Sequence, residues 1–175
     1  MTEEKVILVN YKDEKQGLMD KMQAHIEGVL HRAFSIFIFN SQGELLLQQR
    51  ALSKYHTPGL WTNTCCSHPR DGESLEQATK RRLMEEMGMH CELTKIFDFI
   101  YKADVGLGLT EHEFDHVFVG KSDDLPVINK KEVESYRYAS LEAIRKEMEV
   151  DPEQFTVWFR IAFERVEDYY FNQKI

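Results

Sequence analysis

One short segment of the chain brings together side chains of four chemical kinds: a thiol, an imidazole, carboxylates and guanidinium groups. Residues 62–69 read TNTCCSHP and hold Cys66 and His68 two positions apart, Glu73 follows, and residues 81–88 read RRLMEEMG. Thiols, imidazoles and carboxylates are side chains that move protons in enzymes, and arginines bind anionic oxygens. The combination indicates chemistry on a charged substrate.

The second part of this segment is predicted to form a helix over residues 75–87. Ser74 can open it with a capping box, and Gly88 can take the left-handed closing conformation. The 3.6-residue period places Arg82 and Glu86 one turn apart on a face away from the core. Alone, that pair is most simply a solvated ion pair. The residues expected to face the core are Leu75, Ala78, Thr79, Leu83 and Met87.

From residue 67 to residue 89 the chain resembles the Nudix box, in which a glycine, a later glutamate and an Arg-Glu-apolar-x-Glu-Glu-x-Gly helix build a magnesium diphosphate site. Two positions depart from it: Ser67 replaces the first glycine, and Arg82 replaces the first helical glutamate. A guanidinium removes a ligand for a hard cation and supplies donors for diphosphate oxygens. We therefore expect the fold without the hydrolytic site. The matching positions are Glu73, Arg81, Leu83, Glu85, Glu86 and Gly88.

The change at Arg82, together with Cys66 two residues before His68, resembles the type I isopentenyl-diphosphate isomerases. The resemblance covers most of the chain, and the order and spacing of its parts make it specific. It implies an enzyme of isoprenoid biosynthesis that interconverts isopentenyl diphosphate and dimethylallyl diphosphate. The parts are Lys21, His25, His31, residues 50–54 (RALSK), residues 61–69, Glu111, Glu113 and Trp158.

The composition favours a single domain over residues 1–175. Hydrophobic residues make up 42% of the chain, and eleven phenylalanines, seven tyrosines and two tryptophans can build a core. The sequence shows no linker, repeat or low-complexity tract. The net charge of −8 disfavours nucleic acid and anionic membranes as partners. Basic residues that bind phosphate must therefore be gathered locally.

The cysteine pattern and the N-terminal sequence favour the cytoplasm. The apolar run at residues 6–9 is too short for a signal peptide or a membrane span. Three cysteines, with Cys65 and Cys66 adjacent, do not form a disulfide framework. A reducing compartment would keep Cys66 as a thiol, although a cysteine alone is most simply a small buried hydrophobic residue.

The elements that must position these residues are those of a mixed α/β fold. Helices are predicted over residues 75–87 and 141–148 and in a segment opened by Asp151 and Pro152. In this order of elements, a mixed β-sheet is flanked by the helices, as the Nudix resemblance also implies. The predicted strands are residues 6–10, 33–39, 45–50, 94–102, 111–119 and 133–138, with a turn at 41–43.

The strand at 111–119 carries carboxylates on one face. A period of two puts Glu111, Glu113 and Asp115 on that face and His112 and His116 on the other. If the first face met solvent, the pattern would have no functional meaning. Together with histidines from elsewhere, it would offer nitrogen and oxygen ligands for a divalent metal.

The isomerase resemblance implies two metal sites. The first would use His25, His31, His68, Glu111 and Glu113 for Mn²⁺ or Zn²⁺, with His25 and His31 one residue closer than the family spacing. The second would hold Mg²⁺ between Glu86 and the substrate's oxygens. A lone histidine is more often structural, so the expectation of metal binding rests on the three histidines and two glutamates together.

The resemblance makes Cys66 and Glu113 the two groups that move protons, with Tyr101 and Trp158 as further catalytic residues. Cys66 shares a face with His68 in an extended segment, and a nearby cation would lower the pKa of its thiol. Cys65 should point away. The reaction protonates the terminal alkene carbon and removes a C2 proton from the tertiary carbocation, which the ring of Trp158 could stabilise. Trp158 alone is more simply interpreted as a core residue.

The diphosphate of the small-molecule substrate would be bound by cationic side chains, which alone could be a solvated basic face. These are Lys21, Arg50, Lys54 and Arg82.

Two other functions remain open at this stage. A Nudix pyrophosphohydrolase of a nucleoside diphosphate derivative would release phosphate or a nucleotide and would not depend on Cys66, and Arg82 argues against it. A binding module without catalysis would have no need for Cys66 and Glu113, and the chain has both.

Overall fold

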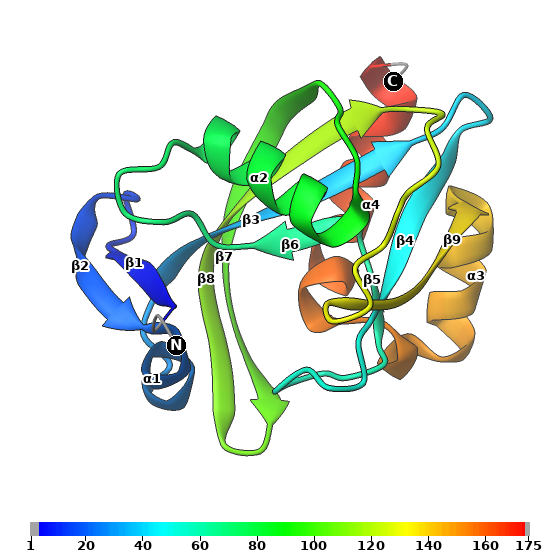
Figure 1. The fold of residues 1–175 in the computed structure, drawn as a ribbon. Coiled ribbons are helices and arrows are strands. Elements are labelled where there is room, and N and C mark those ends of the chain that lie inside the picture. The colour runs from blue at the N-terminus through cyan, green and yellow to red at the C-terminus, as the bar shows by residue number, and fades with distance from the viewer. Residues whose placement is uncertain (1–3, 174–175) are drawn as a thin grey trace.

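Strand β3 (His31–Phe39) forms the centre of the fold in the computed structural model, which describes residues 4–173 (Figure 1). It runs parallel to β8 (Leu109–Lys121), so that His31 lies opposite Glu113. It also pairs in antiparallel orientation with β6 (Cys65–Ser67), where Ser35 lies opposite Cys66. The pairing of β3 thus places the predicted metal ligand His31 opposite Glu113. It also brings Cys66, the second catalytic candidate, next to the same strand.

Both faces of β3 are buried, because side chains that alternate along the strand enter two different hydrophobic clusters. Phe34 and Ile36 pack with residues of α2 (Leu75–Met87). Phe37 and Phe39 pack with residues of α4 (Val157–Gln173). The sheet therefore lies between α2 on one face and α4 on the other, as Figure 1 shows.

The remaining strands extend this arrangement. β7 (Leu93–Gly106) forms a long antiparallel hairpin with β8, and β4 (Glu44–Arg50) pairs with β9 (Val133–Ser140) and with the short β5 (Trp61–Thr62). β1 (Lys5–Val9) joins β3 to β2 (Lys15–Asp20). Helix α1 (Lys21–Glu27) follows β2, and α3 (Leu141–Val150) follows β9. The predicted mixed sheet flanked by helices is confirmed.

Helix α2 has the predicted bounds, because both of its ends are specified by local chemistry. The Ser74 side chain accepts from the Gln77 backbone N–H, and the Gln77 side chain accepts from the Ser74 N–H. Gly88 closes the helix with φ of 62°, and a Cβ at this position would lie 2.5 Å from the Val127 carbonyl oxygen. Only glycine fits both the conformation and the space.

The C-terminal helix begins later than predicted. Pro152–Gln154 form a 3₁₀ turn, Phe155 is extended and bridges Trp61, and α4 starts only at Val157. The backbone of this segment pairs with β5 before it can continue as a helix, since the Thr156 N–H donates to the Trp61 carbonyl at 3.0 Å.

Strand β2 and helix α1 were not predicted. The Asp20 side chain caps α1 by accepting from the Gln23 N–H, and Gly28 closes the helix in the left-handed conformation. This single short helix places His25 in the interior, where its exposed fraction is 0%. In residues 4–173, no helix has both the length and the apolar character needed to span a membrane.

Candidate active site

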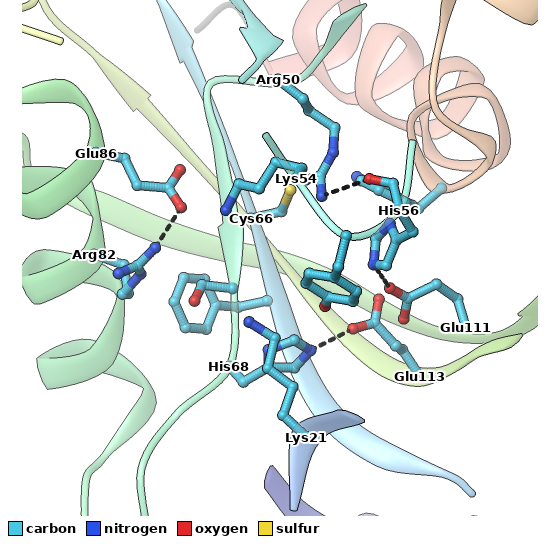
Figure 2. Close-up of a pocket in the computed structure, with 14 residues that line it drawn as sticks. Lys21, Arg50, Lys54, His56, Cys66, His68, Arg82, Glu86, Glu111 and Glu113 are labelled. Carbon is cyan, nitrogen blue, oxygen red and sulfur yellow. Dashed lines mark hydrogen bonds and ion pairs between the residues drawn. The ribbon is translucent and has the colours of Figure 1, made fainter. Parts of the chain in front are cut away.

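A polar pocket opens at the end of the sheet where β3, β6 and β8 meet the 51–60 loop. The space within it and at its open mouth, solvent included, is about 440 Å³. Figure 2 shows Arg82 and Glu86 on one side of it and His56, Glu111 and Glu113 on the other. The lining residues are Lys21, Phe34, Arg50, Lys54, Tyr55, His56, Cys66, Ser67, His68, Arg82, Glu86, Glu111, Glu113 and Trp158.

The two adjacent cysteines face opposite sides of β6, as predicted. Cys66 lines the pocket, while Cys65 is fully buried in the cluster with Phe34 and Ile36. Burial raises the pKa of the Cys66 thiol to about 12, although Arg50 acts to lower it. The protein's own groups therefore favour the neutral thiol at Cys66, and the lowering of its pKa expected from a bound cation would act against this burial.

The carboxylates of β8 face the interior rather than solvent. Glu111, Glu113 and Asp115 are 3%, 8% and 1% exposed, which excludes the reading of this face as a solvated surface. The Tyr101 hydroxyl, on β7, donates a hydrogen bond to Glu113. Asp115 accepts a hydrogen bond from Ser35 at 2.8 Å, further along the same face.

Three predicted metal-binding histidines converge on these carboxylates from three different elements. His25 Nε2, from α1, lies 2.9 Å from Glu111 Oε1, and His68 Nε2, after β6, lies 2.8 Å from Glu113 Oε2. His31 Nε2, at the start of β3, lies 3.5 Å from Glu113 Oε2. The short spacing between His25 and His31 is no obstacle, because their ring centroids are 5.1 Å apart.

This donor set fits a divalent metal ion. One ring nitrogen from each of the three histidines lies within 4.8 Å of the others, as do ligand atoms of His31, Glu111 and Glu113. Among the residues that the structure describes, His31 Nε2 and Glu111 Oε2 are buried without a hydrogen-bond partner. Buried polar atoms need a partner, and imidazoles with carboxylates suit Zn²⁺ or Mn²⁺.

Burial and hydrogen bonding set the charges at this cluster. Burial acts to raise the pKa of Glu113, but the nearby imidazoles of His31 and His68 outweigh it and hold that pKa well below its usual value. Glu111 is held in the same way by His25 and His56. Burial lowers the pKa of His68 to about 4. The cluster thus combines ionised carboxylates with a neutral imidazole, the forms that bind metals.

Trp158 serves both readings that the sequence left open. It is 4% exposed and packs in the cluster with Phe155 and Phe159, and it also lines the pocket. The Arg50 guanidinium lies over the indole, 5.4 Å from the ring centroid. The ring therefore forms an aromatic wall of the pocket beside Cys66 and the β8 carboxylates.

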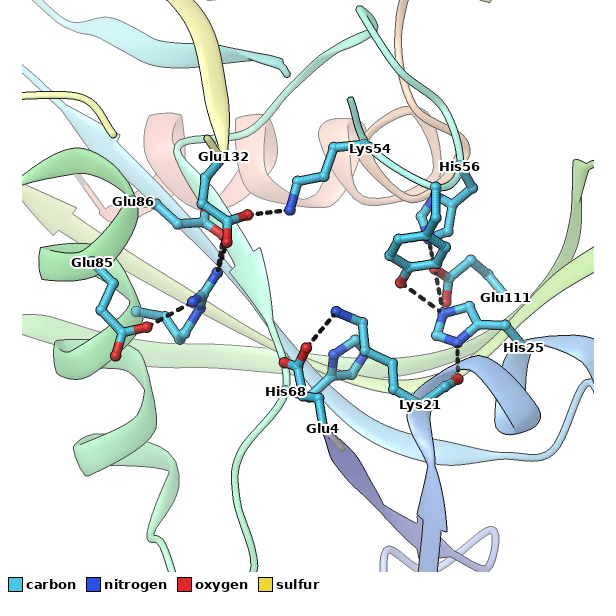
Figure 3. Close-up of polar contacts among 12 residues, drawn as sticks. Glu4, Lys21, His25, Lys54, His56, His68, Glu85, Glu86, Glu111 and Glu132 are labelled. Carbon is cyan, nitrogen blue, oxygen red and sulfur yellow. Dashed lines mark hydrogen bonds and ion pairs between the residues drawn. The ribbon is translucent and has the colours of Figure 1, made fainter. Parts of the chain in front are cut away.

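The four predicted diphosphate-binding cations all line the pocket, and three of them are engaged by carboxylates (Figure 3). Lys21 Nζ is 3.0 Å from Glu4, and Arg82 NH2 is 2.6 Å from Glu86. Lys54 forms an ion pair with Glu132, which also lies 3.6 Å from Arg82. The pair of Arg82 and Glu86 is not a solvated surface pair, because Glu86 is 4% exposed.

Among the residues of this site that the sequence analysis missed is His56, in the loop between β4 and β5. It is 3% exposed, and its Nε2 lies 2.7 Å from Glu111 Oε1. Loop residues have no periodicity that could predict their direction. The available signal was its position, two residues after Lys54 in a segment already assigned to the diphosphate.

Comparison with known proteins places this geometry in a family. The NUDIX domain model matches residues 29–159. An isopentenyl-diphosphate Delta-isomerase from Pectobacterium atrosepticum is 52% identical over 165 residues, covering 94% of this chain and 92% of that protein. One from Burkholderia multivorans is 50% identical over 163 residues, covering 93% of both chains.

Solved structures agree on the fold. A Deinococcus radiodurans protein superposes with a TM-score of 0.71 at 21% identity, covering 85% of this chain and 90% of the other. The MutT protein from Methanosarcina mazei Go1 has a TM-score of 0.67 at 23% identity, covering 79% and 94%. At these identities the likeness concerns architecture alone.

Proposed function

Because the chain belongs to the NUDIX domain family and, within it, to the isopentenyl-diphosphate Delta-isomerases, we propose that the pocket described above performs the allylic shift. The protein is an isomerase that interconverts isopentenyl diphosphate and dimethylallyl diphosphate. The observation that carries the assignment of the pocket is that Cys66 and Glu113 line the same cavity as an aromatic wall and a set of cations. The pyrophosphohydrolase alternative is not favoured.

The proposed proton-transfer groups are Cys66 and Glu113. They come from β6 and β8, which lie on opposite edges of β3, so they approach the cavity from different strands. An allylic shift needs a proton delivered to one carbon and another removed from its neighbour. Two groups on separate strands can serve both carbons without a covalent bond to the enzyme. Tyr101, which donates to Glu113, fixes the orientation of that carboxylate.

The metal site that we propose comprises His25, His31, His68, Glu111 and Glu113. When bound, a divalent ion there would neutralise the two carboxylates and polarise groups that face it. The family uses a divalent metal, and the donor set favours Mn²⁺ or Zn²⁺ at this position. Glu86, on the other side of the pocket, is the candidate to share Mg²⁺ with substrate oxygens.

The diphosphate is proposed to lie on the side of Lys21, Lys54 and Arg82. Figure 2 separates Arg82 from the β8 carboxylates across the pocket, which leaves the hydrocarbon end to approach Cys66 and Glu113. Arg50 lies between the two regions, against the indole of Trp158. A reducing compartment such as the cytoplasm suits this proposal, since Cys66 is a free thiol.

The proposed function is tested by NMR of the purified protein with isopentenyl diphosphate and Mg²⁺ in deuterated water. Dimethylallyl diphosphate should appear, with deuterium incorporated at the carbon that receives the new proton. Phosphate release from nucleoside diphosphate derivatives is followed in parallel. Release of phosphate with an unchanged isopentenyl substrate would assign the pocket to the hydrolase instead.

Changes at Trp158 should reveal whether its ring face stabilises the cation. Trp158→Leu is expected to lower kcat about 30-fold, because a desolvated cation–π interaction is worth about 2 kcal/mol. Trp158→Phe keeps a ring face and should lose less. Both enzymes are compared by steady-state kinetics, and thermal unfolding measures how far the core is weakened. Equal kcat values for the two variants would contradict the cation role.

Removing the Lys54 ammonium should weaken substrate binding without slowing the chemical step. We expect Lys54→Ala to raise KM about 10- to 150-fold at nearly constant kcat, because a hydrogen bond to a charged group is worth about 1.5–3 kcal/mol. Lys80→Ala is the matched control, since Lys80 forms an exposed ion pair with Glu76 on α2. A changed kcat with unchanged KM would be inconsistent with a role in holding the diphosphate.

A further inference from the structure

His56 stands apart from the other histidines of the site because it contacts the cluster through one carboxylate oxygen. Its Nε2 is 2.7 Å from Glu111 Oε1, and its Nδ1 is 3.0 Å from the Thr57 hydroxyl oxygen. His25 Nε2 approaches the same Oε1 at 2.9 Å. Figure 3 shows His25 and His56 on either side of Glu111. Two imidazoles therefore converge on a single oxygen of this carboxylate.

The second oxygen of Glu111 is directed to a different group of atoms. Glu111 Oε2 lies 4.0 Å from His31 Nε2, and both atoms are buried without hydrogen-bond partners in residues 4–173. His31 belongs to the ligand groups formed with His25 and His68, and with Glu111 and Glu113. His56 forms such a group only with His25 and Glu111. Within these groups, His56 is thus linked to the cluster through His25 and Glu111 and not through His31.

The contact with Glu111 indicates which ring nitrogen of His56 carries the proton. A hydroxyl that donates to Nδ1 leaves the proton of a neutral imidazole on Nε2, where it points at Glu111. An ionised carboxylate accepts only, so the 2.7 Å contact between Nε2 and Glu111 Oε1 requires the proton on Nε2. Partners of this kind fix the rotation of a ligating carboxylate, and their loss typically weakens metal binding about 10- to 100-fold.

We propose that His56 is a positioning residue of the metal site: its Nε2–H holds Glu111 Oε1, and this turns Oε2 toward His31 and the metal. The inference rests on the metal site proposed above and adds a residue to it. The backbone of His56 is held by Arg50, whose guanidinium donates to the His56 carbonyl oxygen at 3.3 Å. Its ring also lies edge-on to Trp158, with centroids 6.0 Å apart.

The test measures Mn²⁺ binding to metal-stripped protein, with free Mn²⁺ followed by electron paramagnetic resonance. His56→Ala is expected to raise the dissociation constant about 10- to 100-fold. His56→Gln places an N–H donor near the same position and should stay within about threefold to fivefold of the unchanged protein. The Co²⁺ absorption spectrum of His56→Gln should match that of the unchanged protein, because a positioning residue leaves the ligands themselves in place.

A matched control is His116→Ala. His116 is 4% exposed, lies on β8 and bonds Asp13 at 2.9 Å on the other face of the strand. It should bind Mn²⁺ as the unchanged protein does, while circular dichroism and thermal unfolding confirm that each metal-free variant is folded. A loss in His116→Ala as large as that in His56→Ala would overturn the specific role of His56.

Two further outcomes would overturn the inference. Unaltered Mn²⁺ affinity in His56→Ala would show that Glu111 is oriented without it. A His56→Gln variant that binds as poorly as His56→Ala, with a changed Co²⁺ spectrum, would make His56 a direct ligand. Failure of the unchanged protein to bind Mn²⁺ would instead overturn the metal site itself. This outcome is distinguished from a failure of the His56 proposal because it is seen in the unchanged protein, before any variant is compared.

Discussion

Replacing Cys66 by alanine is expected to abolish isomerisation while the protein stays folded and binds its substrate. The thiol lines the pocket and is the only sulfur among its lining residues. A positioned acid or base contributes about 10²–10⁴-fold to a reaction rate, and the loss should fall at the upper end because nothing else at this position carries a proton. Conversion and deuterium incorporation are measured together by NMR.

The neighbouring cysteine is not a useful control, because Cys65 is buried in the core and its removal leaves a cavity. Cys91, which is half-buried and donates to the Lys121 carbonyl, is suitable. Cys91→Ala should turn over at the unchanged rate, and Cys66→Ser should recover little because a hydroxyl is a much weaker acid than a thiol. More than a tenth of the activity in Cys66→Ala would exclude the thiol from proton transfer.

Glu113→Gln is expected to lose activity at least as severely, by about 10³-fold or more, since acid–base catalysis alone accounts for about 10²–10⁴-fold. The substitution removes a proton acceptor and also the negative charge that His31 and His68 approach. Mn²⁺ affinity should therefore fall together with kcat. Steady-state kinetics at saturating metal, beside a metal titration, separate the two losses.

Asp115→Asn provides the comparison for Glu113→Gln. Asp115 lies on the same face of β8, two residues further on, and accepts from Ser35. Its change to the amide should leave metal affinity and turnover nearly unaltered. If saturating metal restored full turnover to Glu113→Gln, the carboxylate would be a ligand only and the proton acceptor would have to be sought elsewhere.

The accuracy of the sequence-based predictions depends on whether the relevant information is local. Helix α2 was predicted to the residue because Ser74 and Gly88 specify its ends through their own backbone chemistry. The inward face of β8 followed from strand periodicity, although its burial did not, since a carboxylate face is equally compatible with solvent. Whether this face of β8 is buried depends on the residues that pack against it, and these come from α1, β3 and the segment after β6.

The features that the sequence did not predict depend on contacts that are not local. The start of α4 is displaced to Val157 because Phe155 bridges Trp61, a contact between residues far apart in the chain. Strand β2 has no buried residue in its pattern, so alternation gave no signal. His56 lies in a loop whose path is set by hydrogen bonds to Arg50, which no local pattern records.

Glu132 is expected to compete with the diphosphate of the substrate for the same cationic side chains. Its carboxylate bridges Lys54 and Arg82, so the free enzyme already holds an anion where the substrate's charge is proposed to lie. A diphosphate that binds Lys54 and Arg82 would compete with this carboxylate for their donors, and the carboxylate would pair with them again once the diphosphate leaves. Substrate and product of an isomerase carry the same diphosphate, so a high affinity for this group in the substrate is also a high affinity for it in the product. We expect this internal anion to shorten the residence time of both, and so to let product exchange keep pace with the chemical step.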